Sequence, residues 1–361
     1  MSHLEALGWN RYFEAHLDPA LDAGLVPARI VEEQRGSYRA AGAAGLYFAK
    51  LAGQLRHRIE TTGADRPCVG DWAMARVPEG GAERGEALLH RVLPRRTKFS
   101  RKEAGERSVE QVIAANVDTV FLVQSLNHDL NLRRMERYLA LLWESGATPV
   151  IVLSKADLCP DPASLLEGVE RVARGVSVHV VSALEPGGLD SLLPYIETGR
   201  TVALVGSSGV GKSTIVNRFA GRDLLRVHAI REDDRGRHTT TSRQLVLLPG
   251  GGMLLDTPGM RTLLMWEGEA GLSHAFEDVE AIAAGCRFRD CGHEAEPGCA
   301  VREALETGRL EPERFRSYRK LQREVIHEAA KTDERLRRAE ADRWRKIHRA
   351  ARQRPDKRNV R

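Results

Sequence analysis

The 361-residue sequence has no long apolar run, and aromatic residues make up only 5% of it. Its uninterrupted apolar stretches, such as residues 150–153, are far shorter than the roughly 20 residues that a membrane-spanning helix needs. Residues 1–5 also lack the basic start and apolar core of a secretory signal peptide. We therefore expect no membrane partner and a cytoplasmic location.

Cysteine is also scarce, because five residues in the whole chain are too few and too unevenly spread for a disulfide scaffold. A composition of 42% hydrophobic and 29% charged residues excludes a chain that is disordered throughout. At a typical size of about 150 residues per domain, the length corresponds to two or three domains. We expect several folded domains with water-exposed surfaces.

Positive charge is concentrated at the C-terminal end. The net charge is +5, yet residues 311–361 hold 18 Lys and Arg against 9 Asp and Glu, while the rest of the chain holds 37 against 41. A basic end on a mildly acidic body indicates a polyanionic partner that is contacted mainly through that end. A solvated, charged helix is the alternative interpretation of the same charges.

Residues 28–94 contain short alternating apolar stretches separated by turns with Gly or Pro, which is the pattern of a small all-β domain. Five such stretches suit a small barrel such as the OB-fold, a fold that commonly binds oligonucleotides. The stretches are residues 30–31, 38–40, 46–51, 72–77 and 88–92. We place an N-terminal extension at 1–35 and an OB-fold at 36–100.

The polar, basic stretch 94–107 has no clear period and predicts an interdomain linker. After it, strand-like apolar runs alternate with helical patterns, which predicts a mostly parallel sheet covered by helices, an α/β domain at 108–266. The strand-like runs are 117–123, 149–153, 176–181, 201–205 and 253–255, and the helical patterns are 131–145, 161–174, 188–197 and 211–221. A helix with only a thin apolar stripe is predicted over 317–351.

Residues 206–213 fit the phosphate-loop pattern G-x-x-x-x-G-K-[ST], with a predicted strand before them and a predicted helix after them. Backbone N–H groups of such a loop surround phosphates at a helix N-terminus. We expect Lys212 to reach the β and γ oxygens and Ser213 to bind Mg²⁺. The predicted nucleotide contacts are Gly206, Ser207, Ser208, Gly209, Val210, Gly211, Lys212, Ser213 and Thr214.

A second phosphate-sensing element follows the run at 253–255. Residues 256–259 read Asp-Thr-Pro-Gly and fit the D-x-x-G pattern of nucleotide hydrolases. We expect Asp256 to hold Mg²⁺ through a water molecule, and the N–H of Gly259 to sense the γ-phosphate.

Two further motifs indicate a guanine pocket. Ser154-Lys155-Ala156-Asp157 resembles the N-K-x-D element of GTPases, and Ser182-Ala183 resembles the element that completes the base pocket. The Asp157 carboxylate can accept both hydrogen bonds that guanine N1 and N2 donate, which adenine cannot offer. The pattern therefore predicts GTP rather than ATP. Because Ser154 stands at the usual Asn position, part of the hydrogen bonding within the pocket stays open.

The order of these elements is unusual. In ordinary small GTPases the phosphate loop comes first and the base-reading elements come last, whereas here residues 154–157 and 182–184 precede the phosphate loop. The order predicts a circularly permuted G domain, in which the sheet is kept and the chain ends are moved. Whatever follows residues 256–259 is then attached directly to a nucleotide-sensing segment.

Three of the five cysteines and one histidine gather within fourteen residues: Cys286, Cys291, His293 and Cys299. Three thiolates and one imidazole are the ligand set of a closed tetrahedral zinc site. No open coordination position is evident in this pattern, so we expect one structural Zn²⁺ per chain. We place a zinc-binding, mostly helical module with a basic end at 267–361.

Together these features resemble the RsgA (YjeQ) family of GTPases that depend on the small ribosomal subunit. The resemblance covers essentially the whole chain and rests on residues 206–214, Arg237-His-Thr-Thr-Thr241, residues 256–260 and the order of domains. It implies an OB-fold, a permuted GTPase and a zinc domain that act in late maturation of the small (30S) subunit. The partners would be GTP and GDP, the subunit and its 16S rRNA. We expect a monomer.

The attacking water needs a residue to position it. Ras-like enzymes use a Gln directly after the D-x-x-G element, but here Met260 stands there and cannot hydrogen-bond to water. His238 is the nearest candidate, and we expect Thr240 to bind Mg²⁺ and the γ-phosphate; a surface histidine without a role is the alternative. We therefore expect the protein by itself to hydrolyse GTP slowly. A partner that orders this segment should stimulate hydrolysis.

Three functions from different classes fit the sequence. The first is a ribosome-assembly GTPase, the second a GTP-gated RNA-binding clamp whose turnover is incidental, and the third a P-loop ATPase that passes metal on through the Cys/His cluster. Nucleotide preference separates the third from the others. Stimulation of turnover by small ribosomal subunits separates the first from the second.

Overall fold

The computed structural model describes residues 2–34, 36–62, 66–78, 86–102, 110–127, 130–222, 243–256 and 269–332. The chain divides into two compact units. The first comprises Met1–Arg101 and Gln111–Leu264, and the second Lys102–Glu110 and Met265–Arg361. Within the described ranges, none of the helices is both long and apolar enough to cross a membrane.

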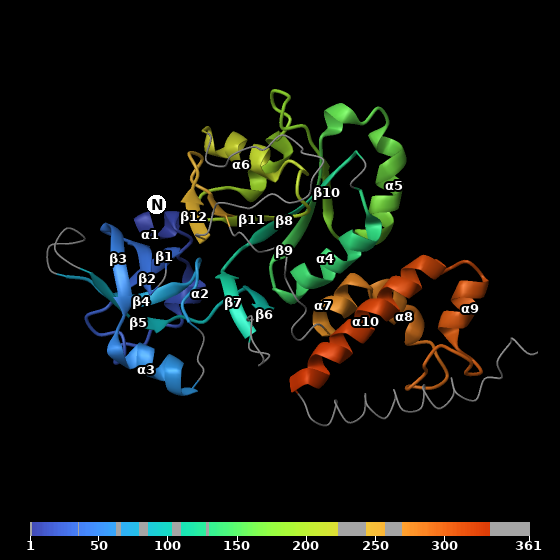
Figure 1. Ribbon diagram of the computed structural model, residues 1–361, viewed down its shortest axis with the longest axis horizontal. Helices are drawn as coiled ribbons and strands as arrows, with labels where there is room; N and C mark the ends of the chain where they lie inside the picture. Colours follow the sequence, from blue (N-terminus) through green and yellow to red (C-terminus); the bar gives the residue numbers. More distant parts are fainter. Residues whose placement is uncertain are drawn as a thin grey trace, which may run out of the picture. The chain divides into compact units, whose positions relative to one another are not determined.

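The N-terminal part of the first unit is a closed barrel (Figure 1). Its strands are β1 (Val26–Gln34), β2 (Ser37–Gly42), β3 (Gly45–Leu51), β4 (Trp72–Arg76) and β5 (Ala87–Val92). They pair in the order β1-β2-β3-β5-β4, and β4 pairs back onto β1, which closes the barrel. The predicted five-stranded barrel is confirmed. Strand β1 lies within the residues assigned to an N-terminal extension, so the barrel sheet begins at Val26.

Alternating burial along the barrel strands explains why these residues form a sheet. Tyr38 and Ala40 on β2 and Tyr47 and Ala49 on β3 are buried in one apolar cluster, while Phe48 between the last two points outward. Helix α3 (Gly53–Thr62), which the sequence analysis missed, joins β3 to β4. It adds Leu55 and Ile59 to the same cluster and so covers an opening of the barrel core.

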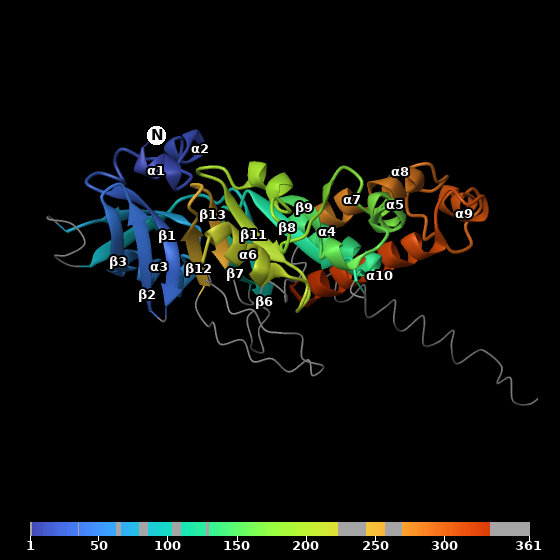
Figure 2. The same cartoon turned by 90° about the horizontal axis from the view of Figure 1, so that it is seen from above.

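Two short helices before the barrel, α1 (His3–Ala6) and α2 (Arg11–Glu14), lie against it (Figure 2). The Trp9 ring packs edge-on to the Trp72 ring with centroids 4.9 Å apart, and the Phe13 ring lies 5.8 Å from the same indole. All three side chains are buried. Aromatic packing therefore holds the segment from Trp9 to Phe13 to the barrel.

The central part of the first unit is an α/β domain. Its strands are β8 (Thr119–Ser125), β9 (Thr148–Ser154), β10 (Ser177–Val180), β11 (Thr201–Val205), β12 (Arg243–Leu247) and β13 (Met253–Asp256). They lie in the order β10-β9-β8-β11-β13-β12, in which the first five are parallel and β12 is antiparallel. The helical elements are α4 (Leu132–Glu144), α5 (Pro162–Val172), α6 (Lys212–Ala220) and the 3-10 helices η2 (Ala156–Leu158) and η3 (Asp190–Tyr195). The predicted parallel sheet is confirmed, and β12 is an addition to it.

The predicted linker is partly wrong. Residues 98–102 form strand β6 (Lys98–Lys102), which pairs with β7 (Glu110–Ala115) in a two-stranded sheet. The reason is local packing, since Phe99 is buried and the Lys98 N–H donates to the Ser145 carbonyl at 3.0 Å. Phe99 is surrounded by basic residues, so the sequence shows no alternating apolar pattern that would predict strand β6.

The described residues of the second unit form four helices: α7 (Glu269–Ala275), α8 (Glu277–Ala283), α9 (Ala300–Glu306) and α10 (Pro312–Thr332). Helix α10 begins five residues before the predicted start. It packs through Tyr318, Leu321 and Val325, which are buried, and through Arg314, which pairs with Asp278 at 2.8 Å. The part of the predicted helix beyond Thr332 lies outside the described residues.

Candidate functional site

The predicted phosphate loop connects the end of β11 to the start of α6. Gly206, Gly209 and Gly211 all have positive φ angles, which other residues adopt only with strain. A Cβ on Gly206 would lie 2.2 Å from the Val123 carbonyl oxygen, so the loop runs directly over strand β8. Gly211 is the N-cap of α6 and makes no side-chain cap, so the helix presents its first N–H groups to a ligand.

Lys212 lies across this loop. Its Nζ donates to the Gly206 carbonyl at 2.9 Å and to the Ser207 carbonyl. Ser213 and Thr214 follow in the first turn of α6 and are partly exposed, whereas Val210 is buried in the core beneath the loop. Loop backbone, ammonium group and hydroxyl therefore lie together, as the motif predicts.

The two base-reading motifs also meet. Ser154 ends β9, Lys155 adopts a left-handed conformation with φ of 57°, and Ala156 and Asp157 lie in η2. The Ser182 hydroxyl, which follows β10, donates to Asp157 Oδ1 at 2.7 Å. This bond links residues 25 positions apart and orients the carboxylate that was predicted to read guanine. Ala183 follows Ser182 and packs against the core of the sheet.

Ser154 connects the predicted base-reading element to the predicted phosphate loop. Its side chain is buried, and Oγ lies 2.6 Å from the Val210 carbonyl oxygen and 3.3 Å from the Gln124 carbonyl oxygen. The hydroxyl has one proton to donate, and the shorter contact is to Val210. The serine at the usual Asn position therefore contacts the phosphate loop through its hydroxyl.

Asp256 ends β13, which lies parallel to β11. The phosphate loop, Ser154, Ser182 and the end of β13 all follow the carboxyl ends of parallel strands, the edge at which open α/β sheets bind ligands. His238, Thr240, Gly259 and Met260 lie outside the described residues. The structure therefore assembles the base and phosphate elements and leaves the predicted roles of those four residues as predictions.

The comparisons with known proteins decide the family. The family model of the RsgA GTPase matches residues 92–266. A relative from Opitutus terrae, named small ribosomal subunit biogenesis GTPase RsgA, is 46% identical over 361 residues, which cover 97% of each chain. The chain belongs to the RsgA GTPase family. A second RsgA, from Syntrophotalea carbinolica, is 44% identical over 90% of each chain.

Solved structures agree with membership of the RsgA family. YjeQ from Thermotoga maritima matches with a TM-score of 0.62 and 25% identity, covering 84% of this chain and 99% of that one. YloQ, described as a circularly permuted GTPase, matches with a TM-score of 0.61 and 23% identity, covering 84% and 96%. The YloQ likeness concerns the fold. The predicted permuted arrangement of the G domain is confirmed.

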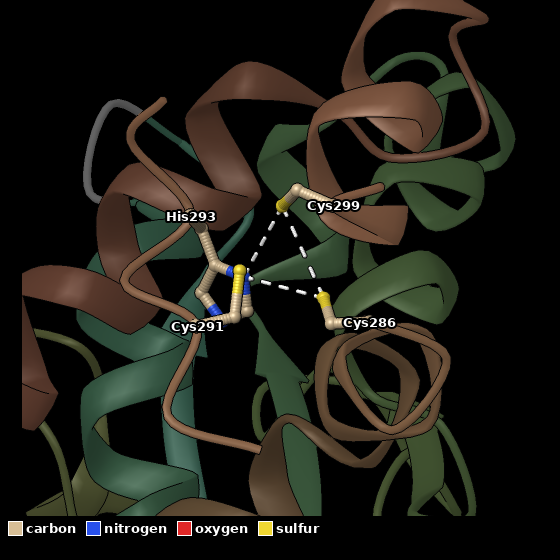
Figure 3. Close-up of side chains that lie close together, drawn as sticks. All are labelled: Cys286, Cys291, His293 and Cys299. Atoms are coloured by element: carbon tan, nitrogen blue, oxygen red, sulfur yellow. Dashed lines mark hydrogen bonds between the residues drawn. The ribbon is translucent and has the colours of Figure 1, made fainter. Parts of the chain in front are cut away.

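The four predicted metal ligands gather at one point of the second unit (Figure 3). Their ligand atoms all lie within 4.8 Å of one another. His293 Nδ1 lies 3.4 Å from Cys299 Sγ and 3.6 Å from Cys286 Sγ, and the two sulfurs lie 3.9 Å apart. Zinc bonds of about 2.0–2.3 Å in a tetrahedron place ligand atoms roughly 3.3–3.8 Å apart. The cluster, which includes Cys291, fits a zinc ion.

Local structure holds these ligands in place. Cys286 follows α8, His293 has a φ of 60°, and Cys299 is the N-cap of α9, where its sulfur accepts the Arg302 N–H. Between the ligands, hydrogen bonds from the N–H groups of Glu296 itself, Glu294 and Gly292 lower the pKa of the Glu296 carboxyl to about 2. The sequence analysis did not predict that Glu296 accepts these hydrogen bonds. An acidic residue in a short loop between two metal ligands was the signal that could have indicated it.

Proposed function

We propose that this protein is a GTPase that hydrolyses GTP to GDP and phosphate during biogenesis of the small (30S) ribosomal subunit. The observation that carries the proposal is the contact of Ser182 with Asp157, which joins the base-reading elements at the edge where the phosphate loop lies. The name of a relative that is 46% identical over 97% of this chain, small ribosomal subunit biogenesis GTPase RsgA, supports the ribosomal role.

Each part of the site has a role in this proposal. The N–H groups of residues 206–213 and the Lys212 ammonium hold the phosphates, and the Asp157 carboxylate accepts the guanine N–H groups. Ser213, Thr240 and Asp256, the last through water, would hold Mg²⁺. When bound, that ion neutralises charge on the β and γ oxygens. Lys212 lies over the loop and offsets charge that develops as the terminal phosphate departs.

Hydrolysis also needs an oriented water. Met260 provides no hydrogen bond, so His238 is assigned to orient the water and the Gly259 N–H to contact the γ-phosphate. We infer that turnover is slow for the protein alone and rises when the subunit orders residues 237–241.

The second unit completes the proposal. Cys286, Cys291, His293 and Cys299 hold one structural Zn²⁺, because all four positions of a closed tetrahedral site come from the chain itself. We infer that the protein works as a cytoplasmic monomer late in maturation and that its basic end contacts 16S rRNA.

The test is GTP turnover by the full-length protein with and without purified small ribosomal subunits. We expect stimulation by the subunits, loss of turnover in Lys212→Ala, and normal turnover in Lys50→Ala, whose side chain pairs with Glu86 on the barrel. Subunit binding that depends on GTP without any stimulation would favour the RNA-binding clamp. A preference for ATP would favour the metal-transfer ATPase instead.

A further inference from the structure

The barrel and the G domain share one continuous sheet of eleven strands (Figure 2). The seam is formed by barrel strand β1 and G-domain strand β12, which pair antiparallel with Glu32 opposite Gln244 and Glu33 opposite Arg243. Barrel and nucleotide domain are therefore joined by main-chain hydrogen bonds and not only by a covalent connection.

Side chains reinforce the seam. Arg243 donates to Glu33 Oε2 at 3.0 Å, and both side chains are shielded, with 13% and 31% of their surface exposed. The Glu32 carboxylate accepts hydrogen bonds from Gln34, Gln244 and Arg39. Burial raises the pKa of Glu32, but these hydrogen bonds lower it below its usual value, so the carboxylate stays ionised at neutral pH.

The seam lies at the nucleotide edge of the G domain. Gln244 pairs with Glu32 on one side of β12 and with Asp256, the end of β13, on the other. Arg243 follows the threonine segment 237–241 by two positions. The Glu33–Arg243 contact thus fixes the start of β12, which follows the predicted nucleotide-sensing segment 237–241. It also lies one strand away from Asp256, where the second predicted segment, 256–259, begins.

The same barrel strand is fixed a second time, four residues earlier. The buried Arg29 guanidinium donates to Thr201 Oγ1 at 2.8 Å and to the Asn116 carbonyl at 3.0 Å, and it contacts Met253 Sδ at 3.3 Å. Thr201 and Met253 begin β11 and β13, at the end of these strands away from the phosphate loop. Arg29 therefore anchors β1 to the G domain at the end of the sheet away from the phosphate loop, and Glu33 contacts it at the nucleotide end.

We propose that Glu33 is a positioning residue for GTP hydrolysis, acting through Arg243 to set where β12, and Asp256 beside it at the end of β13, lie relative to the phosphate loop. The inference rests on the proposed function. A partner that binds the barrel thereby biases the nucleotide site, and by thermodynamic reciprocity the bound nucleotide biases the barrel. Because 31% of the Glu33 side chain is exposed, solvent screens its pairing with Arg243, and we expect loss of the pair to change position more than folding stability.

The test compares Glu33→Gln, Arg243→Gln and the exchanged pair Glu33→Arg with Arg243→Glu, in the full-length protein. Glu86→Gln, which breaks the exposed Lys50–Glu86 pair on the same barrel, is the matched control. For each protein we measure intrinsic turnover, KM for GTP, turnover with small ribosomal subunits and the melting temperature. Amide hydrogen exchange over residues 26–34 is compared between GDP and a non-hydrolysable GTP analogue.

We expect each single variant to lose about 3- to 10-fold of the subunit-stimulated kcat, within the range seen for coupling residues, while KM and the melting temperature stay near wild type. The nucleotide-dependent exchange difference over 26–34 falls by about half or more, and the exchanged pair restores both. Unchanged stimulation and exchange, or a loss that follows the melting temperature, overturns the proposal. Absence of stimulation in the wild type contradicts the proposed function, and the exchange measurement still decides the role of Glu33.

Discussion

The Ser154 hydroxyl lies 2.6 Å from the Val210 carbonyl oxygen and joins the base-reading element to the phosphate loop. Val210 is buried, so its carbonyl has little access to water if that donor is removed. Serine is shorter than the asparagine usual at this position, and its hydroxyl still reaches the Val210 carbonyl of the loop. The contact makes loop geometry depend on one hydroxyl.

Ser154→Ala should weaken GTP and GDP binding by about 5- to 10-fold, because a lost hydrogen bond with a buried acceptor costs on the order of 1 kcal/mol. Ser154→Thr, which keeps the hydroxyl, should bind nearly as wild type. Titration with a fluorescent guanine nucleotide measures both. Ser164→Ala, at an exposed position on α5, is the control, and equal affinity in Ser154→Ala and this control would contradict the assigned contact.

Asp157→Asn should reduce the preference for GTP over ATP by about 100-fold or more, because hydrogen bonds to a charged group contribute about 1.5–3 kcal/mol each and the amide cannot accept both. Ser182→Ala should cause a smaller loss, since it removes the donor to Asp157 Oδ1 and the acceptor of the Leu184 N–H but leaves the Asp157 carboxylate in place. Competition between unlabelled GTP and ATP measures the ratio. Asp161→Asn, which affects the N-cap of α5 four residues later, should leave it unchanged.

The chemistry-bearing segments could be predicted because their signals are local. The glycines and Lys212 of the phosphate loop, and the cysteines with His293, occur at spacings that a short peptide requires whatever surrounds it. The parallel strands were found for a related reason, since strands buried on both faces are nearly continuous apolar runs.

Features that depend on distant partners were missed. Strand β12 is short, and it pairs with β1, whose Glu33 lies 210 residues before Arg243. Nothing in residues 243–247 announces that partner. Arg29 is a buried charged residue in barrel strand β1, and two of its hydrogen-bond acceptors, the Asn116 carbonyl and the Thr201 hydroxyl, come from the distant G domain. Long-range pairing of this kind is set by the tertiary fold and not by local pattern.

The zinc assignment predicts one Zn²⁺ per chain and a C-terminal unit that loses stability without it. Structural zinc contributes on the order of 10 kcal/mol to folding of small modules, so Cys286→Ser or strong chelation should unfold this unit. Intrinsic GTP turnover should persist, because the ligands take no part in the nucleotide site. Elemental analysis measures the bound zinc, and circular dichroism measures the folding of the C-terminal unit. Cys159→Ser, outside the metal cluster, is the control. Natively folded protein without metal would contradict the zinc assignment.

His238→Ala should lower subunit-stimulated turnover by about 10²-fold, the lower range for loss of a group that orients or deprotonates a nucleophile. Nucleotide affinity should stay close to wild type, because the residue is assigned to the water and not to the bound ground state. Stopped-flow binding and single-turnover hydrolysis separate the two effects. His57→Ala, exposed on α3, is the control, and a parallel loss of binding in His238→Ala would identify a structural histidine.

The basic end should bind rRNA through phosphate contacts. The candidate residues are Arg335, Arg337, Arg338, Arg343, Arg345 and Lys346, all outside the described residues. For duplex RNA contacts, log affinity falls with log salt by nearly one for each phosphate neutralised. Deleting residues 331–361 should therefore weaken small-subunit binding and make it less salt-dependent. The slope of log affinity against log salt concentration should become shallower by up to about five.

In the competing interpretation, the basic C-terminal helix only packs on its own protein and stabilises it. The position of the buried residues of α10 distinguishes this packing role from an RNA-binding role. Its buried residues among those described, Arg314, Tyr318, Leu321 and Val325, all precede the cut, so truncation should leave the melting temperature and intrinsic turnover unchanged. A full-length variant with the six basic residues changed to Gln should reproduce the loss of binding and of stimulation. Sedimentation with small subunits at two salt concentrations, beside melting curves, measures both. A lower melting temperature with intact subunit binding would establish a packing role and remove the basic end from the RNA interface.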